Sequence, residues 1–119
     1  MKTLAAAALA LALTTGAAVA QPAQDAENQR DLTCMAVFLT IADSEDVQMQ
    51  QAGTIGSLFF YGRLQGRAPE VNWFERLAAY AEAVTMDELM GHAQECGGIV
   101  ERVGQEMVDY SEQYTPAEE

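Results

Sequence analysis

Positive charge is scarce in this chain of 119 residues. Lys and Arg together number 6, against 18 Asp and Glu, and the formal net charge at pH 7 is −12. Because nucleic-acid binding depends on basic side chains that neutralise phosphates, this composition excludes a nucleic-acid partner. The same excess of carboxylates repels anionic lipid head groups and keeps the protein soluble. We therefore expect a solvated, acidic outer surface.

Side chains suited to catalysis or metal binding are also few. The only histidine is His92, so any Ser-His-Asp or Cys-His arrangement would have to use it. Zinc bound by His92 and Cys96 would need further ligands and a free thiolate. The haem-attachment motif C-x-x-C-H is absent, and the acidic run 43–46 lacks the alternating register of a calcium loop. The sequence therefore predicts a non-enzymatic protein without a metal site or cofactor.

The chain also has no hydrophobic run long enough to span a membrane. Its longest apolar stretch lies near the start. Residues 1–20 combine Lys2, an apolar stretch over 4–13 and the small residues 18–20. This pattern is typical of a secretory signal peptide and predicts cleavage after Ala20. The stretch is shorter than the ~20 apolar residues of a membrane anchor. We expect a periplasmic or secreted protein, with no membrane segment after cleavage.

The remaining chain is expected to form one small domain. Cleavage removes the only lysine and leaves five arginines against 18 carboxylates, a formal charge of −13. Residues 21–30 are polar and without apolar periodicity, which predicts a disordered arm. Residues 31–113 form the predicted helical domain, and residues 114–119 a frayed tail. A chain of this size has room for a single hydrophobic core.

Helical spacing dominates residues 31–113, and strand patterns are almost absent. The predicted helices cover about 31–42, 43–65, 72–84 and 85–110. Thr85 and Glu88 have the spacing of a capping box, which predicts the start of the last helix. The fold class is therefore all-α, a compact four-helix domain with one disulfide between its first and last helices.

The second predicted helix combines small and apolar residues. Gly53 and Gly56 lower helix stability, so a close approach of another helix over that face is the expected compensation. Ile55, Leu58 and the phenylalanines that follow predict a largely buried helix. Five methionines of the exported chain fit either core packing or an adaptable client-binding surface: Met35, Met49, Met86, Met90 and Met107.

The two cysteines, Cys34 and Cys96, are predicted to form a disulfide. An exported protein enters an oxidising compartment, where an even number of cysteines favours a bridge over a catalytic thiol. The pair falls on the first and last predicted helices, so the bridge would enclose most of the domain. In the chain-entropy description a loop of this length contributes about 4 kcal/mol of stability. The alternative is a pair of free, buried thiols.

Two of the arginines, Arg63 and Arg67, lie one helical turn apart at the end of the second predicted helix. In one interpretation they satisfy the last carbonyls of that helix and pair with nearby acids. In the other they form a small cationic site for a carboxylate or a phosphate. Both interpretations stay open, and the pair is the candidate anion site of the chain.

The framework of Cys34, the string Gly62–Arg67 and Cys96 resembles small exported helical proteins of Gram-negative bacteria that have no assigned role. The pair Thr33-Cys34, followed by Phe38-Leu39, is also similar to acid-activated periplasmic chaperones of the HdeA type. That resemblance implies an acid-stress holdase. Nearly all carboxylates become protonated between pH 7 and pH 2, which can loosen a fold.

The sequence as a whole predicts an acidic, exported helical protein with a structural or binding role. Its partner would be an unknown protein or a small anionic ligand. An acid-stress periplasmic holdase is the alternative function.

Overall fold

The computed structural model describes residues 17–114, with side chains placed from Gln24 onward. The helices are α1 (Ala17–Ala42), α2 (Val47–Arg67), α3 (Trp73–Ala83), α4 (Met86–Met90) and α5 (Ala93–Glu112). Residues 17–114 contain no strand. The all-α prediction is confirmed, with four longer helices and the five-residue α4. Most of the predicted signal peptide (1–16) and residues 115–119 of the predicted tail lie outside the described residues.

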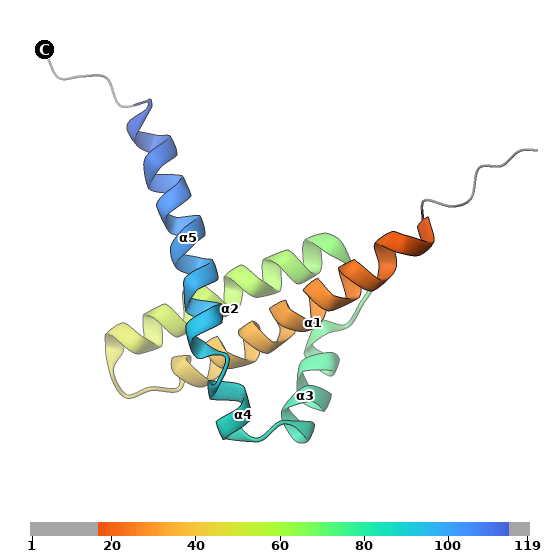
Figure 1. The fold of residues 1–119 in the computed structure, drawn as a ribbon. Helices are drawn as coiled ribbons and strands as arrows, with labels where there is room; N and C mark the ends of the chain where they lie inside the picture. Colours follow the sequence, from red (N-terminus) through yellow and green to blue (C-terminus); the bar gives the residue numbers. More distant parts are fainter. Residues whose placement is uncertain (1–16, 115–119) are drawn as a thin grey trace, which may run out of the picture.

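The centre of the molecule is a hairpin of α1 and α2, which lie side by side over most of their length (Figure 1). The Asp46 side chain caps α2 by accepting a hydrogen bond from the Met49 backbone N–H at 2.9 Å. Phe60 and Leu64 of α2 are completely buried, as is Val37 of α1. The core therefore forms mainly between these two helices.

Gly53 and Gly56 allow the hairpin to close, as their spacing predicts. A Cβ atom at Gly53 would lie 2.2 Å from the Ala42 backbone nitrogen, and one at Gly56 would lie 2.2 Å from the Phe38 ring. Real Cβ atoms do not tolerate such distances. The two glycines thus bring the backbone of α2 directly against α1, which offsets their cost in helix stability.

Replacing Gly53 by alanine should lower the free energy of unfolding by about 1–3 kcal/mol, because the new methyl group overpacks against rigid backbone. Gly62→Ala is the matched control in the same helix, since a Cβ at Gly62 meets nothing within 4 Å. The control should stabilise the protein by up to about 1 kcal/mol through helix propensity. Urea unfolding of both variants measures the difference, and a neutral Gly53→Ala would contradict the close approach.

The predicted starts of the third and fourth helices are confirmed. The Asn72 side chain accepts the Glu75 backbone N–H at 3.2 Å and caps α3. Thr85 and Glu88 form the complete capping box of α4. The backbone N–H and the side chain of Thr85 both donate to the Glu88 carboxylate, which holds the pKa of Glu88 below its usual value. These local signals act as predicted because each involves residues three positions apart.

The last predicted helix is broken into α4 and α5 at Gly91 and His92. The prediction of one continuous helix over 85–110 is wrong at this point. Leu89 is buried on one side of the break, and Cys96 is bonded to Cys34 on the other. Both residues thereby attach to the core, and Gly91 supplies the weak position where the direction changes (Figure 1). From there α5 rises away from the hairpin.

Residues 21–30 are a further correction, because they belong to α1 rather than to a disordered arm. The predicted cleavage site after Ala20 consequently falls within α1. Contacts of polar side chains account for the difference. The Gln24 side-chain amide donates to the Arg67 carbonyl at 3.4 Å, and the Asn28 carbonyl oxygen accepts from Arg67 Nε at 2.8 Å. Because these contacts are made by polar side chains, the helix produces no apolar periodicity that sequence analysis could detect.

Candidate functional site

The predicted disulfide is present between Cys34 and Cys96, with their Cα atoms 5.2 Å apart. It joins the first and last helices, and both cysteines are completely or almost completely buried. The alternative of two free thiols is therefore excluded. Neither sulfur is available as a nucleophile or as a metal ligand.

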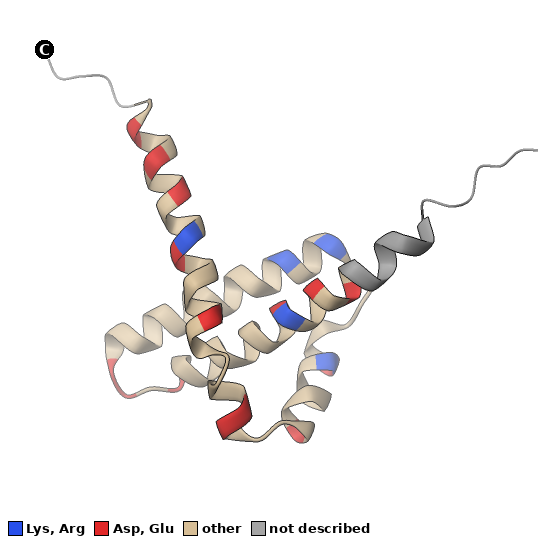
Figure 2. Ribbon diagram, in the orientation of Figure 1, with Lys and Arg blue, Asp and Glu red and all other residues tan. Residues whose placement is uncertain are grey.

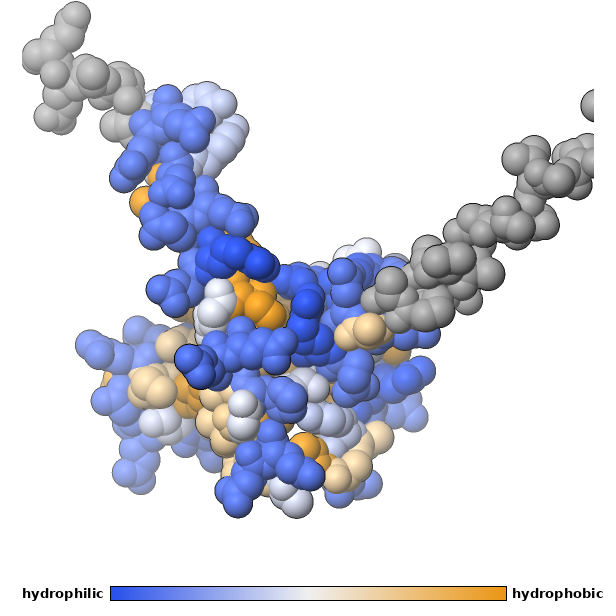
Figure 3. Space-filling model, in the orientation of Figure 1, coloured by the Kyte–Doolittle hydropathy of each residue, from blue (hydrophilic) through white to orange (hydrophobic). Residues whose placement is uncertain are grey.

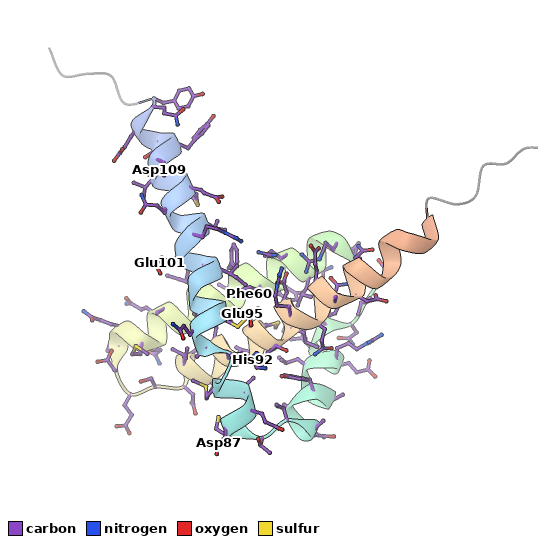
Figure 4. All side chains as sticks on the ribbon, in the orientation of Figure 1. Phe60, Asp87, His92, Glu95, Glu101 and Asp109 are labelled. Atoms are coloured by element: carbon purple, nitrogen blue, oxygen red, sulfur yellow. A yellow bond between two sulfur atoms is a disulfide. The ribbon has the colours of Figure 1, made fainter. Side chains whose placement is uncertain are left out.

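His92 lies at the base of α5, next to Glu95 (Figure 4). Its Nδ1 atom is 3.8 Å from Glu95 Oε2, and both side chains are about half exposed. No group of three or more His, Cys, Asp or Glu residues in the described part of the chain is arranged to hold a metal ion. None of the helices within 17–114 is long and apolar enough to cross a membrane.

Arg63 and Arg67 both contact one carboxylate, that of Asp31 on α1. Arg63 Nε donates to Asp31 Oδ2 at 2.8 Å, and Arg67 Nη2 donates to the same oxygen. The Asp31 side chain is completely buried, whereas those of Arg63 and Arg67 are 27% and 20% exposed. The pair thus lies against an internal anion, as the structural interpretation expects. Binding of an external anion stays a prediction.

The second oxygen of the same carboxylate is less well satisfied. Asp31 Oδ1 is buried and accepts no hydrogen bond from the described residues. Arg30 Nε lies 3.7 Å from it. The Arg63 guanidinium also lies over the Phe59 ring, 5.5 Å from its centroid. Arg63 therefore contacts both the buried Asp31 carboxylate and the aromatic ring of Phe59.

Among the hollows in the described part of the chain, three lie beside α1. A polar one of about 550 Å³ includes Arg67 and Arg76, and an apolar one of about 520 Å³ includes Leu39 and Leu89. The third, of about 430 Å³, lies beside the disulfide and includes His92. In the described residues His92 makes no hydrogen bond to a hydroxyl or thiol.

The outer face of α2 is uncharged and exposed. It consists of Val47, Gln51, Thr54, Ile55, Leu58 and Gly62. Figure 2 shows α2 without charged residues over most of its length, with arginines only near its end. Ile55 is 65% exposed, Leu58 63% and Val47 63%. The prediction that α2 is largely buried is wrong, because Gly53 and Gly56 select the face that packs on α1 and no described helix covers the opposite one.

The helix α5 exposes a second apolar surface. It packs on α1 only near its base and then projects away from α1–α4, which together are called the body (Figure 1). Met107 and Tyr110 on its outer half, and Tyr114 in the turn just after it, are more than 60% exposed. A hydrogen bond with Tyr114 holds the pKa of Tyr110 above its usual value. Figure 3 shows a small apolar area where α5 meets the body, framed by hydrophilic side chains.

The candidate functional features of the described residues are thus one disulfide, one buried carboxylate with two arginines, and two exposed apolar helix faces. The disulfide was predictable from the sequence. Asp31 and the outer face of α2 were missed, and Asp31 had a signal, since it is the only charged residue between 31 and 42. No protein-family model, curated protein or solved structure matches this chain.

Proposed function

We propose that this chain is an exported, non-enzymatic protein that binds another protein through the outer face of α2. The observation that carries the proposal is the exposure of Ile55 and Leu58 on a helix face without charge. The chain has a net charge of −12, so an uncharged face of this length is unusual on its surface. Export is proposed from the signal-like residues 1–20 and is supported by the disulfide.

Single exposed apolar residues are normal on soluble proteins and need no explanation. Here Val47, Ile55 and Leu58 share one face, with uncharged residues between them. The centres of protein interfaces are depleted in charged residues in the same way. Gly62 lies on this face, where a side chain would meet nothing within 4 Å. A partner that packs closely on α2 would account for a glycine that the hairpin itself does not require.

The proposal is tested by photo-crosslinking in the cell that produces the protein. A photo-activatable amino acid replaces Leu58 in the full chain, and a matched chain has it at Glu82, an exposed position of α3. We expect a discrete adduct with another protein from position 58 and none from position 82. Adding Ile55→Glu should reduce the adduct roughly tenfold, the loss typical of a contact at the centre of an interface. Equal adducts from both positions, or none from either, would overturn the proposal.

The proposal that the protein is not an enzyme is tested separately. If the pure protein turned over a substrate and His92→Ala abolished that turnover, the chain would be an enzyme. We expect no such activity, because the described residues provide no base paired with a nucleophile.

An acid-stress holdase is the second candidate. Exposed methionines favour it, since Met49, Met86 and Met107 are 48%, 59% and 68% exposed and can adapt to varied clients. With all 18 carboxylates protonated, the five arginines of the exported chain would leave it positive. This function requires that the protein suppress the aggregation of client proteins at pH 2–3. An absence of suppression at that pH would rule out the holdase.

A further inference from the structure

One apolar stripe of α5 is buried at its base and exposed at its tip. Cys96, Val100, Val103, Met107, Tyr110 and Tyr114 follow one another in alternating steps of four and three residues. Cys96 is completely buried and Val100 packs against the core. The seam consists of the last four residues of the stripe, Val103, Met107 and Tyr110 of α5 and Tyr114, which lies in the turn just after α5. This spacing is that of the a and d positions of a coiled coil.

We propose that the seam is covered by the seam of a second copy of this chain, in an antiparallel pair. The proposal concerns α5 and is independent of the binding face assigned to α2. Because both chains are acidic, the pair can form only if carboxylates of one copy do not face carboxylates of the other beside the seam.

The residues beside the seam meet that requirement. Gly104 and Ser111 flank it on one side, and Glu106 and Gln113 on the other, so only one of the four is charged. Two other carboxylates of α5, Glu101 and Asp109, project to the left of the helix in Figure 4, away from the part of α1 that lies to its right. A basic partner would instead need acids beside the seam. The charge pattern therefore favours a second copy.

The antiparallel direction follows from the position of the body. The base of the stripe is occupied by α1, so a parallel pair would bring two acidic bodies to the same end. In an antiparallel pair the bodies lie at opposite ends. The same register places Val103 opposite Tyr114 of the second copy and Met107 opposite Tyr110 of the second copy. Large side chains thus meet smaller ones.

Small residues on one flank allow this pair to pack closely. In the antiparallel register Gly104 faces Ser111 of the second copy. A Cβ at Gly104 would meet nothing within 4 Å in the single chain, so the fold of one copy gives no packing reason for glycine there. A neighbouring helix on that flank supplies one.

The area available suits a modest, concentration-dependent dimer. Buried aromatic side chains contribute roughly 150 Å² or more each, and the pair brings together four tyrosines, two methionines and two valines. With all of these side chains completely buried, the total would approach the ~1,000 Å² that a biological interface should exceed. The equilibrium should therefore be visible by sedimentation of the full chain over a range of micromolar concentrations.

The test compares Met107→Glu with Val108→Glu in the full chain. Both residues are exposed, at 68% and 49%, and both changes introduce the same charge on adjacent positions, but only Met107 belongs to the seam. Sedimentation equilibrium should show a dimer for the wild type and for Val108→Glu, and a dimer at least tenfold weaker for Met107→Glu. A monomeric wild type, or equal behaviour of the two variants, would overturn the proposal.

A mixing experiment tests the direction. Chains with Met107→Cys and chains with Tyr110→Cys are combined and oxidised, and the crosslinked species are counted. The antiparallel pair should give more mixed crosslinks than crosslinks within either population, whereas a parallel pair gives the reverse. Circular dichroism of each variant reports whether it is folded, and failure of crosslinking at Leu58 would leave this result unaffected.

Discussion

Asp31→Ala is expected to lower the free energy of unfolding by about 3–5 kcal/mol, the range for breaking a buried ion pair from one side. The carboxylate of Asp31 is completely buried and receives hydrogen bonds from Arg63 and Arg67. Its loss leaves two guanidinium groups at the α1–α2 contact without a counter-ion. Because these groups are 27% and 20% exposed, water can partly replace the carboxylate, and the lower end of the range is expected. Urea unfolding followed by circular dichroism measures the change.

The matched control is Asp43→Ala, which removes an exposed acid just after α1. It should change the stability by no more than about 0.5 kcal/mol, as is usual for surface positions. A double-mutant cycle with Arg67→Ala separates the pair interaction from loss of packing. If Asp31→Ala cost no more than the Asp43 control, the carboxylate would not hold the two helices together.

This cluster also shows which parts of the site the sequence could predict. The spacing of Arg63 and Arg67 singled them out and left two interpretations open. Their contact with Asp31 could not be derived, because it depends on how α1 and α2 align over more than 30 residues of chain. A charged residue at the start of an apolar run was the available signal. An aspartate in that position is equally typical of a helix N-cap, so the signal did not distinguish a cap from a buried ion pair.

The fold was predictable where the interactions are local. The capping box of Thr85 and Glu88 involves a single helical turn, and two cysteines permit only one pairing within the chain. The glycines of α2 predicted a close helix contact because their cost requires compensation. By contrast, the exposure of Ile55 depends on the number of helices that surround α2. Periodicity within a single helix does not contain that information.

The break at Gly91 and the helical residues 21–30 were missed for related reasons. An apolar pattern in steps of four and three runs through Gly91 without interruption, so the sequence favoured one long helix. The direction changes because Leu89 and Cys96 both attach to the core. In residues 21–30 the stabilising contacts are made by amide side chains, such as that of Asn28. Such residues are also typical of disordered segments.

Removal of the disulfide is the second change with a large expected effect. The double variant Cys34→Ser and Cys96→Ser should lose about 4 kcal/mol of stability, since the bridge closes a loop with a sequence separation of 62. Chemical reduction of the wild type should give a similar loss under the same conditions. Thermal and urea unfolding of the oxidised, reduced and double-serine proteins provide the comparison. A loss below about 1 kcal/mol would mean that the bridge constrains the unfolded chain far less than its loop length implies.

The loss should also be uneven along the chain. The hairpin of α1 and α2 contains most of the core, whereas α5 is held at its base by the bridge and by partly buried residues such as Val100. Without the bridge, hydrogen exchange should accelerate first in α5, while amides of the hairpin near Phe60 stay protected. Uniform acceleration over all helices would show that α5 and the hairpin unfold as one unit. Because the seam of α5 requires an ordered helix, the double-serine variant should dimerise more weakly even where the hairpin stays folded.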